Sequence, residues 1–363
     1  IGTLDIAVNG GKIAALGNFL NLEAREVIDA EGKLVFPGLI ETHAHMLLPF
    51  AGTITKNDFY QGTKAGAFGG VTTLIDFADQ KKGELPMPAI ERRVRQAEGK
   101  ATVDYGFHCT LTDINEATLE QIEAIMDLGI TSFKFYTIYK DDGLFVDDGE
   151  LLTAFKKIAQ LGGLVTVHAE NEAIISRKIS ELKSKGQVSP NCFSLSKPAI
   201  SEEEAISRVI LLAREAKVPI LIRHVSSAGG VRAILEAKKT GQEVYGETCP
   251  HYLTFTNQVY QREDGRNYIV HPPIREERDL EGLWAGIRNG AISVIGTDDC
   301  AFTKEQKKMS DVFYEIPGGM PGIETRLQVM YQEGVNKGRI SLEKLVEITS
   351  TNVAKIYGLY PKK

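Results

Sequence analysis

Eight short runs rich in β-branched and aromatic residues recur along this chain, and stretches with helical spacing separate them. The runs are PGLIETH, VTTLIDFA, VDYGFHCTL, TSFKFYTIY, LVTVHAE, PILIRHVSS, EVYGETCPHYL and AISVIGTDD. Between them lie amphipathic segments such as ATLEQIEAIMDLG and SEEEAISRVILLAREAK, and we expect the second helix to begin at Ser201. Because alternating strands and helices build parallel sheets, eight such units predict an α/β fold with a (β/α)8 TIM-like barrel.

The segments outside these units carry separate expectations. Residues 1–35 predict a partial β-sandwich segment, an accessory β-layer with strands on both sides of an NGG turn and in REVIDAEGKLV. Residues 36–363 then hold the barrel, with loops over its mouth at about 178–197 and 257–267. After Asp298 the sequence predicts closing helices, from PGIETR to KIYGL.

Composition and charge exclude several partners. Lys and Arg number 42 against 48 Asp and Glu, which gives a net charge of −6. No basic run is present to follow a phosphate backbone, so nucleic acid is not expected as a partner. No apolar run approaches the roughly 18 residues of a membrane span. The cysteines lie far apart without C-x-x-C spacing, which indicates reduced thiols and a cytoplasmic protein; they are Cys109, Cys192, Cys249 and Cys300.

Six polar residues stand at the carboxyl ends of five predicted strands. They are His43 and His45 in the first run, Lys134 in the fourth, His168 in the fifth, His224 in the sixth and Asp298 in the eighth. In a barrel these ends meet at one mouth, where active sites are built. Strand residues two positions apart share a face, so His43 and His45 can bind one cation together.

Each of these residues also has an ordinary explanation when it is taken singly. A lone H-x-H after a strand is more often surface chemistry than a metal site, and Lys134 fits a snorkelling surface lysine. His168 and His224 fit satisfied core histidines. Asp298 fits a turn or a helix cap. Jointly, these explanations require six residues to reach the same end of five strands by accident, so we favour a shared site.

Four neutral imidazoles and a carboxylate suit Zn²⁺ or a similar cation. An ammonium beside a dication is repelled, so Lys134 fits only if its charge is removed, for example by N6-carboxylation to a carbamate that bridges two divalent metal ions. The predicted ligands are His43, His45 and Asp298 on one ion and His168 and His224 on the other, with the modified Lys134 between them. Two such ions share a hydroxide that attacks a carbonyl at neutral pH.

The motifs of the chain resemble those of a known family. PGLIETHAHMLLPFAGT, GVTTLIDFA, SFKFY, VTVHAEN, RHVSS, GETCPHYL, HPPIRE, GTDD and PGIETR are similar to the D-hydantoinase and dihydropyrimidinase branch of the cyclic amidohydrolases. The similarity runs from about residue 6 to residue 360, in order and with similar spacing. It implies a binuclear zinc hydrolase that opens the cyclic amide of hydantoins or dihydropyrimidines with a metal-bridging hydroxide. It also implies a homo-oligomer, a tetramer or a dimer.

The resemblance further implies roles for single residues. Asp298 takes the proton from the attacking water and passes it to the leaving nitrogen. Tyr139 donates a hydrogen bond to the developing oxyanion, although a strand-end tyrosine with its hydroxyl in water explains the residue equally well. Backbone groups at His271 and Gly318 hold the substrate ring. Apolar side chains line a pocket for the exocyclic substituent, or simply pack in the core; they are Leu47, Phe50 and Tyr136.

The chain departs from the family at three positions. His271 stands where these enzymes usually have Ser, and Gly318 stands where they usually have Asn. Asp299 stands where a His commonly follows the catalytic Asp, and we expect this second carboxylate to raise the pKa of Asp298. The chain also lacks the family's first strand and the last strands of the accessory layer, which indicates a shortened homologue or a partial sequence.

Two other interpretations stay open at this point. An allantoinase or dihydroorotase would use the same chemistry. Dihydroorotases carry an Arg two residues after the H-x-H, whereas His45 is followed here by Met46 and Leu47, which disfavours an acidic substrate. A non-catalytic, dihydropyrimidinase-related scaffold protein would share the fold. All six ligand positions are occupied here, which argues against the scaffold.

Overall fold

The structure is a computed structural model that describes residues 2–18 and 23–360. The chain divides into two compact units, Ile1–Pro37 and Gly38–Lys363. In the first unit, β1 (Asp5–Asn9) and β2 (Lys12–Gly17) form an antiparallel hairpin whose turn contains two glycines at positive φ. The NGG turn is therefore confirmed. The strand expected in REVIDAEGKLV is wrong, since residues 25–35 pair with no strand among the described residues and Val27 and Ile28 are about 80% exposed.

The second unit contains all eight predicted barrel strands. In the order of hydrogen bonding around the sheet they are β3 (Leu39–Glu41), β6 (Val71–Asp79), β7 (Asp104–Thr110), β8 (Ser132–Tyr136), β9 (Leu164–His168), β10 (Ile220–Ile222), β11 (Val244–Thr248) and β12 (Ile292–Ile295). Every adjacent pair is parallel. Seven of the strands lie inside their β-rich runs and β6 extends one residue beyond its run, so the predicted barrel architecture is confirmed.

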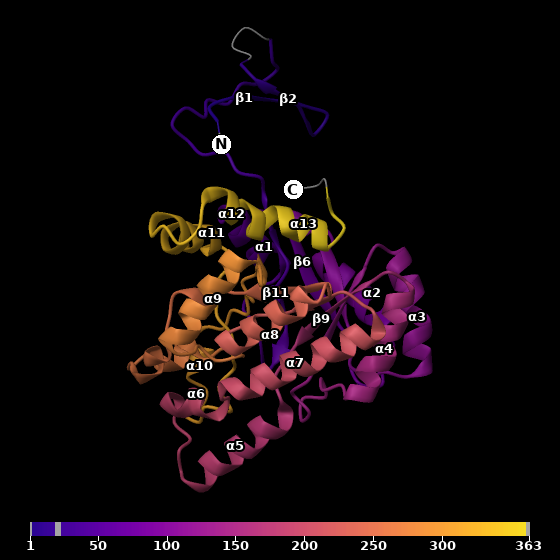
Figure 1. Cartoon of the computed structure of the whole chain (residues 1–363), viewed down its shortest axis with the longest axis vertical. Coiled ribbons are helices and arrows are strands. Elements are labelled where there is room, and N and C mark those ends of the chain that lie inside the picture. The colour runs from indigo at the N-terminus through magenta and orange to yellow at the C-terminus, as the bar shows by residue number, and fades with distance from the viewer. Residues whose placement is uncertain (1, 19–22, 361–363) are drawn as a thin grey trace. The chain divides into compact units, whose positions relative to one another are not determined.

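Helices connect these strands and cover their outer side (Figure 1). They are α1 (Phe59–Phe68), α2 (Pro86–Ala97), α3 (Glu116–Asp127), α4 (Asp148–Gln160), α5 (Glu172–Ser184), α7 (Ala199–Ala216), α8 (Ala228–Lys239) and α9 (Glu277–Asn289). Local signals fix where several of them begin. The side chain of Asn115 caps α3, and Asp147 and Glu150 form a capping box at α4.

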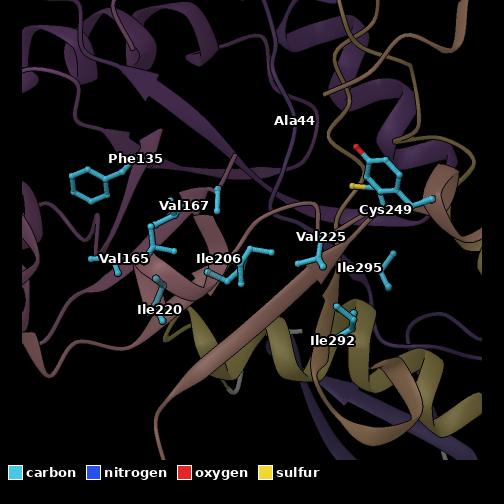
Figure 2. Close-up of a cluster of buried hydrophobic side chains, with 14 of the residues drawn as sticks. Ala44, Phe135, Val165, Val167, Ile206, Ile220, Val225, Cys249, Ile292 and Ile295 are labelled. Carbon is cyan, nitrogen blue, oxygen red and sulfur yellow. The ribbon is translucent and has the colours of Figure 1, made fainter. Parts of the chain in front are cut away.

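The core lies between the strands and these helices. Figure 2 shows Val165 and Val167 of β9 near Ile206 of α7 and Ile220 of β10. All four side chains are fully buried. Strands covered in this way read as continuous apolar runs in the sequence, which is why their positions could be recognised.

The two edge strands of the sheet, β3 and β12, are joined beyond their carboxyl ends. The amide of His45 donates to the carbonyl of Asp299 (2.8 Å), and the amide of Asp299 donates to the carbonyl of His43 (3.1 Å). Deeper in the barrel, the buried Arg326 donates to the carbonyls of Ile40 (3.1 Å) and Ile295 (2.8 Å). The barrel therefore closes at the end where the predicted site residues stand.

Two expected boundaries need correction. The helix expected at Ser201 begins at Ala199, after Pro198, because proline is compatible with the position before a helix. The loop expected at 178–197 begins with the last turns of α5 and ends with α6 (Phe193–Ser196). The closing segment is helical, as expected, in the short elements α11 (Arg326–Met330), α12 (Leu342–Val346) and α13 (Asn352–Ile356), with wider π-type turns between them.

Among the described residues, no helix has both the length and the apolarity needed to cross a membrane. All four cysteines are free thiols.

Candidate active site

A cavity of about 630 Å³ lies at the carboxyl ends of the barrel strands. All of the residues predicted to bind metal, to bind substrate or to act in catalysis line it; they are His43, His45, Leu47, Phe50, Lys134, Tyr136, Tyr139, His168, His224, His271, Asp298 and Gly318. These residues come from strand ends and loops that are up to 275 positions apart in the sequence, from 43 to 318. The fold therefore brings the whole predicted set into one place.

His43, His45 and Asp298 form the first group. Nε2 of His43 lies 3.1 Å from Oδ1 of Asp298, and Nε2 of His45 lies 3.2 Å from the same oxygen. The two imidazole rings have their centres 5.3 Å apart. The alternation of the chain after β3 thus points both rings toward one carboxylate.

His168 and His224 form the second group. Their ring centres are 4.3 Å apart, and the ring of His224 also stacks on that of His43 at 5.3 Å. Ligand atoms of His43, His224 and Asp298 all lie within 4.8 Å of one another, a spacing that suits a metal ion. Side chains of the first and the second group therefore lie close enough to share one metal-binding site.

Lys134 lies between these groups and is only 1% exposed. Its Nζ is 3.4 Å from Nε2 of His43 and faces the rings of Phe77 and Tyr136 at 4.7 and 4.8 Å. Burial, together with the nearby guanidinium of Arg223, lowers the pKa of Lys134 to about 7. A snorkelling surface lysine is thereby excluded, and the amine is neutral in a large fraction of molecules near neutral pH.

Two buried carboxylates orient the imidazoles. Nδ1 of His43 donates to Oε1 of Glu247 at 2.5 Å, and Nε2 of His168 donates to Oε2 of Glu170 at 2.8 Å. Each bond occupies one ring N–H, so the opposite nitrogen of a neutral ring presents its lone pair. Burial lowers the pKa of both histidines, although Glu170 partly opposes the shift at His168.

The donor set fits a bound cation. Because Glu247 takes the Nδ1–H of His43, the lone pair on Nε2 of His43 faces the carboxylate oxygen of Asp298 at 3.1 Å. Two acceptors at this distance repel each other unless a cation lies near both. Nδ1 of His45 and Nδ1 of His224 are buried without a hydrogen-bond partner in the described structure. The residues present therefore fit a metal centre.

The charge state of Asp298 also suits metal binding. Burial alone would raise the pKa of this carboxyl, but positive charge on the facing groups, a proton on His43 or His45 or the ammonium form of Lys134, outweighs burial and holds the pKa well below its usual range. Asp298 is therefore a carboxylate at neutral pH. The expected rise in its pKa from the neighbouring Asp299 is wrong. Oδ2 of Asp299 instead accepts from the amides of Gly322 (2.7 Å) and Ile323 (3.0 Å), a local role that the sequence did not reveal.

Buried ion pairs support the two orienting carboxylates, and none of these residues was singled out from the sequence. Glu247 pairs with Arg223 at 2.8 Å, and Glu170 pairs with Lys197 at 2.7 Å. Glu247 also accepts from the hydroxyl of Thr42 at 3.1 Å. For two of these residues the sequence contained one indication of a role, their position beside a predicted ligand. Glu170 follows His168 by two residues, and Arg223 directly precedes His224.

Tyr139 lies beside the second group, with its ring centre 5.2 Å from that of His168 and 5.8 Å from that of Phe50. Its amide donates to Oε2 of Glu172 at 2.9 Å. Burial raises the pKa of the Tyr139 phenol well above its ordinary value, so the hydroxyl keeps its proton and can donate a hydrogen bond. Tyr139 is partly exposed and lines the cavity, which is compatible both with this role and with the alternative, a hydroxyl in contact with water.

Backbone strain is concentrated around the cavity. Non-glycine residues rarely adopt positive φ, and each such residue costs about 1–3 kcal/mol. Of the six described non-glycine residues that do, only Lys217 lies away from the cavity; the others are Leu47, Ala51, Tyr139, His224 and Asp298. The surrounding structure holds these residues in costly conformations, which is typical of a functional site.

The remaining predicted residues form one wall of the cavity. The ring of His271 packs edge-on against Phe50 at 6.3 Å and Tyr139 at 5.9 Å. Tyr136 is 8% exposed and lies beneath Lys134 and His168. Together with Leu47 these side chains make the wall largely apolar, which suits an uncharged organic ring.

Comparison with known proteins gives the family of the chain. The model of the amidohydrolase family matches residues 34–363, so the chain belongs to that family. Its relatives include a D-hydantoinase of Geobacillus stearothermophilus, which is 42% identical over 99% of this chain and 77% of that protein. A D-phenylhydantoinase of Escherichia coli is 38% identical over 99% of this chain and 78% of that protein.

Solved structures give the same result. The dihydropyrimidinase of Brevibacillus agri superimposes with a TM-score of 0.97 at 40% identity, covering 99% of this chain and 79% of that one. The L-hydantoinase (dihydropyrimidinase) of Arthrobacter aurescens has a TM-score of 0.90 at 34% identity, covering 99% and 80%. The resemblance to the hydantoinase and dihydropyrimidinase branch is thereby confirmed, and with it the expectation of a hydrolase.

Proposed function

We propose that this protein is a binuclear metal hydrolase that opens the cyclic amide of hydantoins or dihydropyrimidines. The observation that carries the proposal is the meeting of four buried imidazoles, Lys134 and Asp298 in one cavity, in a chain whose relatives are named hydantoinases and dihydropyrimidinases. The barrel unit, residues 36–363, would contain all the residues that act on the substrate.

Two divalent metal ions, Zn²⁺ by the chemistry of the donors, would be held by the chain's own side chains. His43, His45 and Asp298 would hold one ion, and His168 and His224 the other. Lys134 would contribute both oxygens of a carbamate between them, formed by N6-carboxylation of its neutral amine. When bound, such a pair of ions lowers the pKa of a water molecule and polarises the carbonyl that is attacked.

The residues of the chain then have separate tasks. Asp298, ionised at neutral pH, takes the proton of the attacking water and delivers it to the ring nitrogen as the C–N bond breaks. Tyr139, whose phenol stays protonated, donates a hydrogen bond to the oxygen on which negative charge develops. Both groups are partly buried in the cavity, where electrostatic interactions are stronger than in bulk water.

Substrate binding would use the largely apolar wall of the cavity. Backbone groups at His271 and Gly318 would bind the ring, and Leu47, Phe50 and Tyr136 would surround an exocyclic substituent. No basic side chain equivalent to a carboxylate clamp follows His45, since Met46 and Leu47 stand there. An uncharged ring therefore fits better than dihydroorotate.

The test combines metal analysis of the purified protein with a panel of hydantoin, dihydrouracil, allantoin and dihydroorotate. The proposal expects close to two divalent ions per chain and turnover of hydantoin or dihydrouracil. If allantoin or dihydroorotate were turned over faster than hydantoin and dihydrouracil, the proposed substrate class would be wrong. A protein with metal but no cyclic amidase activity would refute the function.

Two finer points belong to the same proposal. The protein would act in the cytoplasm, where its four free thiols stay reduced. It would also assemble as a homo-oligomer, a tetramer or a dimer. Light scattering of the purified protein checks the second point, and a mass of 39.9 kDa, that of the single chain, would contradict it.

A further inference from the structure

His271 and Gly318 fit each other in a way that neither residue shows alone. A Cβ placed on Gly318 would lie 2.2 Å from Cδ2 and 2.3 Å from Nε2 of the His271 imidazole. Such distances are far inside van der Waals contact, so the imidazole occupies the volume that any side chain at position 318 would need. The φ of Gly318 lies outside the left-handed region. Glycine is therefore required there for space and not for backbone conformation.

Aromatic neighbours hold the imidazole of His271 in this position. Its ring packs edge-on against Phe193 at 5.3 Å, Tyr139 at 5.9 Å and Phe50 at 6.3 Å. Its Nδ1 is buried and has no hydrogen-bond partner among the described residues. Ring packing, and not a polar anchor at Nδ1, therefore positions the side chain, and its contribution to the site is mainly its volume.

The position of this volume matters for the substrate. His271 and Gly318 both line the cavity, and His271 contacts Phe50, one of the side chains proposed to surround an exocyclic substituent. It also contacts Tyr139, which lies next to His168. On the proposed function, the imidazole therefore takes up space beside Phe50, on the side of the cavity assigned to an exocyclic substituent.

We propose that His271 and Gly318 are a matched pair of specificity-determining residues, which limits the site to cyclic amides with a small exocyclic substituent or none. This inference rests on the proposed function and names the substrate class within it. The imidazole fills the part of the cavity that a bulky aromatic substituent would occupy, and Gly318 provides the space behind the imidazole.

The experiment is a double-mutant cycle of His271→Ser and Gly318→Ala in the metal-loaded full chain. Each variant is measured for kcat/KM with hydantoin and with 5-phenylhydantoin, and for its melting temperature. His271→Ser should raise the ratio of kcat/KM for 5-phenylhydantoin to that for hydantoin by about tenfold or more, since this is the range in which pocket volume discriminates.

Gly318→Ala should lower kcat/KM for both substrates and lower the melting temperature by about 2 °C or more, because the added methyl group displaces a packed ring. In the His271→Ser background the same change should cost little, so the two substitutions are strongly non-additive. Gly106→Ala is the matched control. A Cβ on Gly106 meets nothing within 4 Å, and its φ is ordinary, so this variant should behave as the wild type.

The outcomes separate the two levels of the proposal. A wild type that opens no cyclic amide refutes the proposed function. An active wild type whose substrate ratio is unchanged by His271→Ser refutes the inference alone. The inference also fails if Gly318→Ala has the same cost with and without the imidazole, because the two residues would then act independently.

Discussion

Two sides of the same cavity are built from different interactions. On the metal-binding side, His43 and His168 are each oriented by a buried carboxylate that is paired in turn with Arg223 or Lys197. On the apolar wall, Phe50 and His271 are positioned by contacts between rings. The first side depends on complete ion pairs in a medium of low dielectric constant, whereas the second depends on volume.

This difference indicates which side tolerates change. Removing one partner of a buried ion pair leaves an uncompensated charge, which costs about 3–5 kcal/mol. Replacing one apolar side chain of similar volume by another usually costs less than about 1.5 kcal/mol. The metal-binding side therefore determines whether the reaction occurs, and the apolar wall can vary and so determine which substituted ring is accepted.

The largest effect is expected for Lys134→Ala, which removes the residue between the two histidine groups. The variant should lose metal and activity together, because the four imidazoles and Asp298 would have to hold two ions without the two oxygens of the proposed carbamate. Short-chain carboxylic acids added to the solution should restore part of the activity. Full activity of the untreated variant would show that Lys134 holds no metal ion.

Asp298→Asn tests the next step on the same side. An amide cannot accept the proton of water, so kcat should fall by about a hundredfold or more. Metal analysis of the variant is the necessary companion measurement, because some metal should remain bound through His43 and His45. Turnover equal to that of the wild type would remove Asp298 from the proposed proton transfer.

Tyr139→Phe probes a residue that contacts both sides. Loss of one oxyanion donor typically lowers kcat by about a hundredfold, and the aromatic contacts with Phe50 and His271 should survive. Separate determination of kcat and KM distinguishes the roles. A change confined to KM would assign the hydroxyl to binding of the ground state.

Much of this arrangement could be predicted from the sequence. Most residues of the eight strands are buried, so several strands appear as apolar runs such as LVTVH and ISVI. The order of the strands along the chain is also their order in the sheet. Since parallel strand ends converge, the positions of His43, Lys134 and Asp298 at such ends were enough to place them together.

Other features could not be predicted, for identifiable physical reasons. A single sequence does not show that a charged residue is buried, so Glu247 and Lys197 read as ordinary surface charges although each lies in an ion pair inside the protein. The fit of His271 over Gly318 depends on side-chain positions, which no spacing rule describes. Val27 and Ile28 have the composition of a strand, yet without a partner strand in the described structure they form none.

Glu247→Gln tests whether the ion pair behind the histidines matters for the metal. The amide keeps the size of the side chain but leaves Arg223 without its carboxylate and weakens the hold on Nδ1 of His43. Metal affinity should fall by about 10- to 100-fold, the usual cost of losing such a supporting group. Titration of the metal-free protein measures it, and an unchanged affinity would mean that His43 is oriented by packing alone.

The smallest effect is expected on the apolar wall, with Phe50→Leu. Leucine keeps an apolar surface at this partly exposed position but removes the edge-on ring contacts with Tyr139 and His271. We expect kcat for unsubstituted hydantoin to stay within about twofold and KM for substituted hydantoins to change several-fold, since small changes in pocket volume are worth about 1–3 kcal/mol. Steady-state kinetics with both substrates decides the matter. If kcat for hydantoin fell as far as in Tyr139→Phe, the two sides of the cavity would not be separable, because Phe50 would then be needed to hold Tyr139 in its catalytic position.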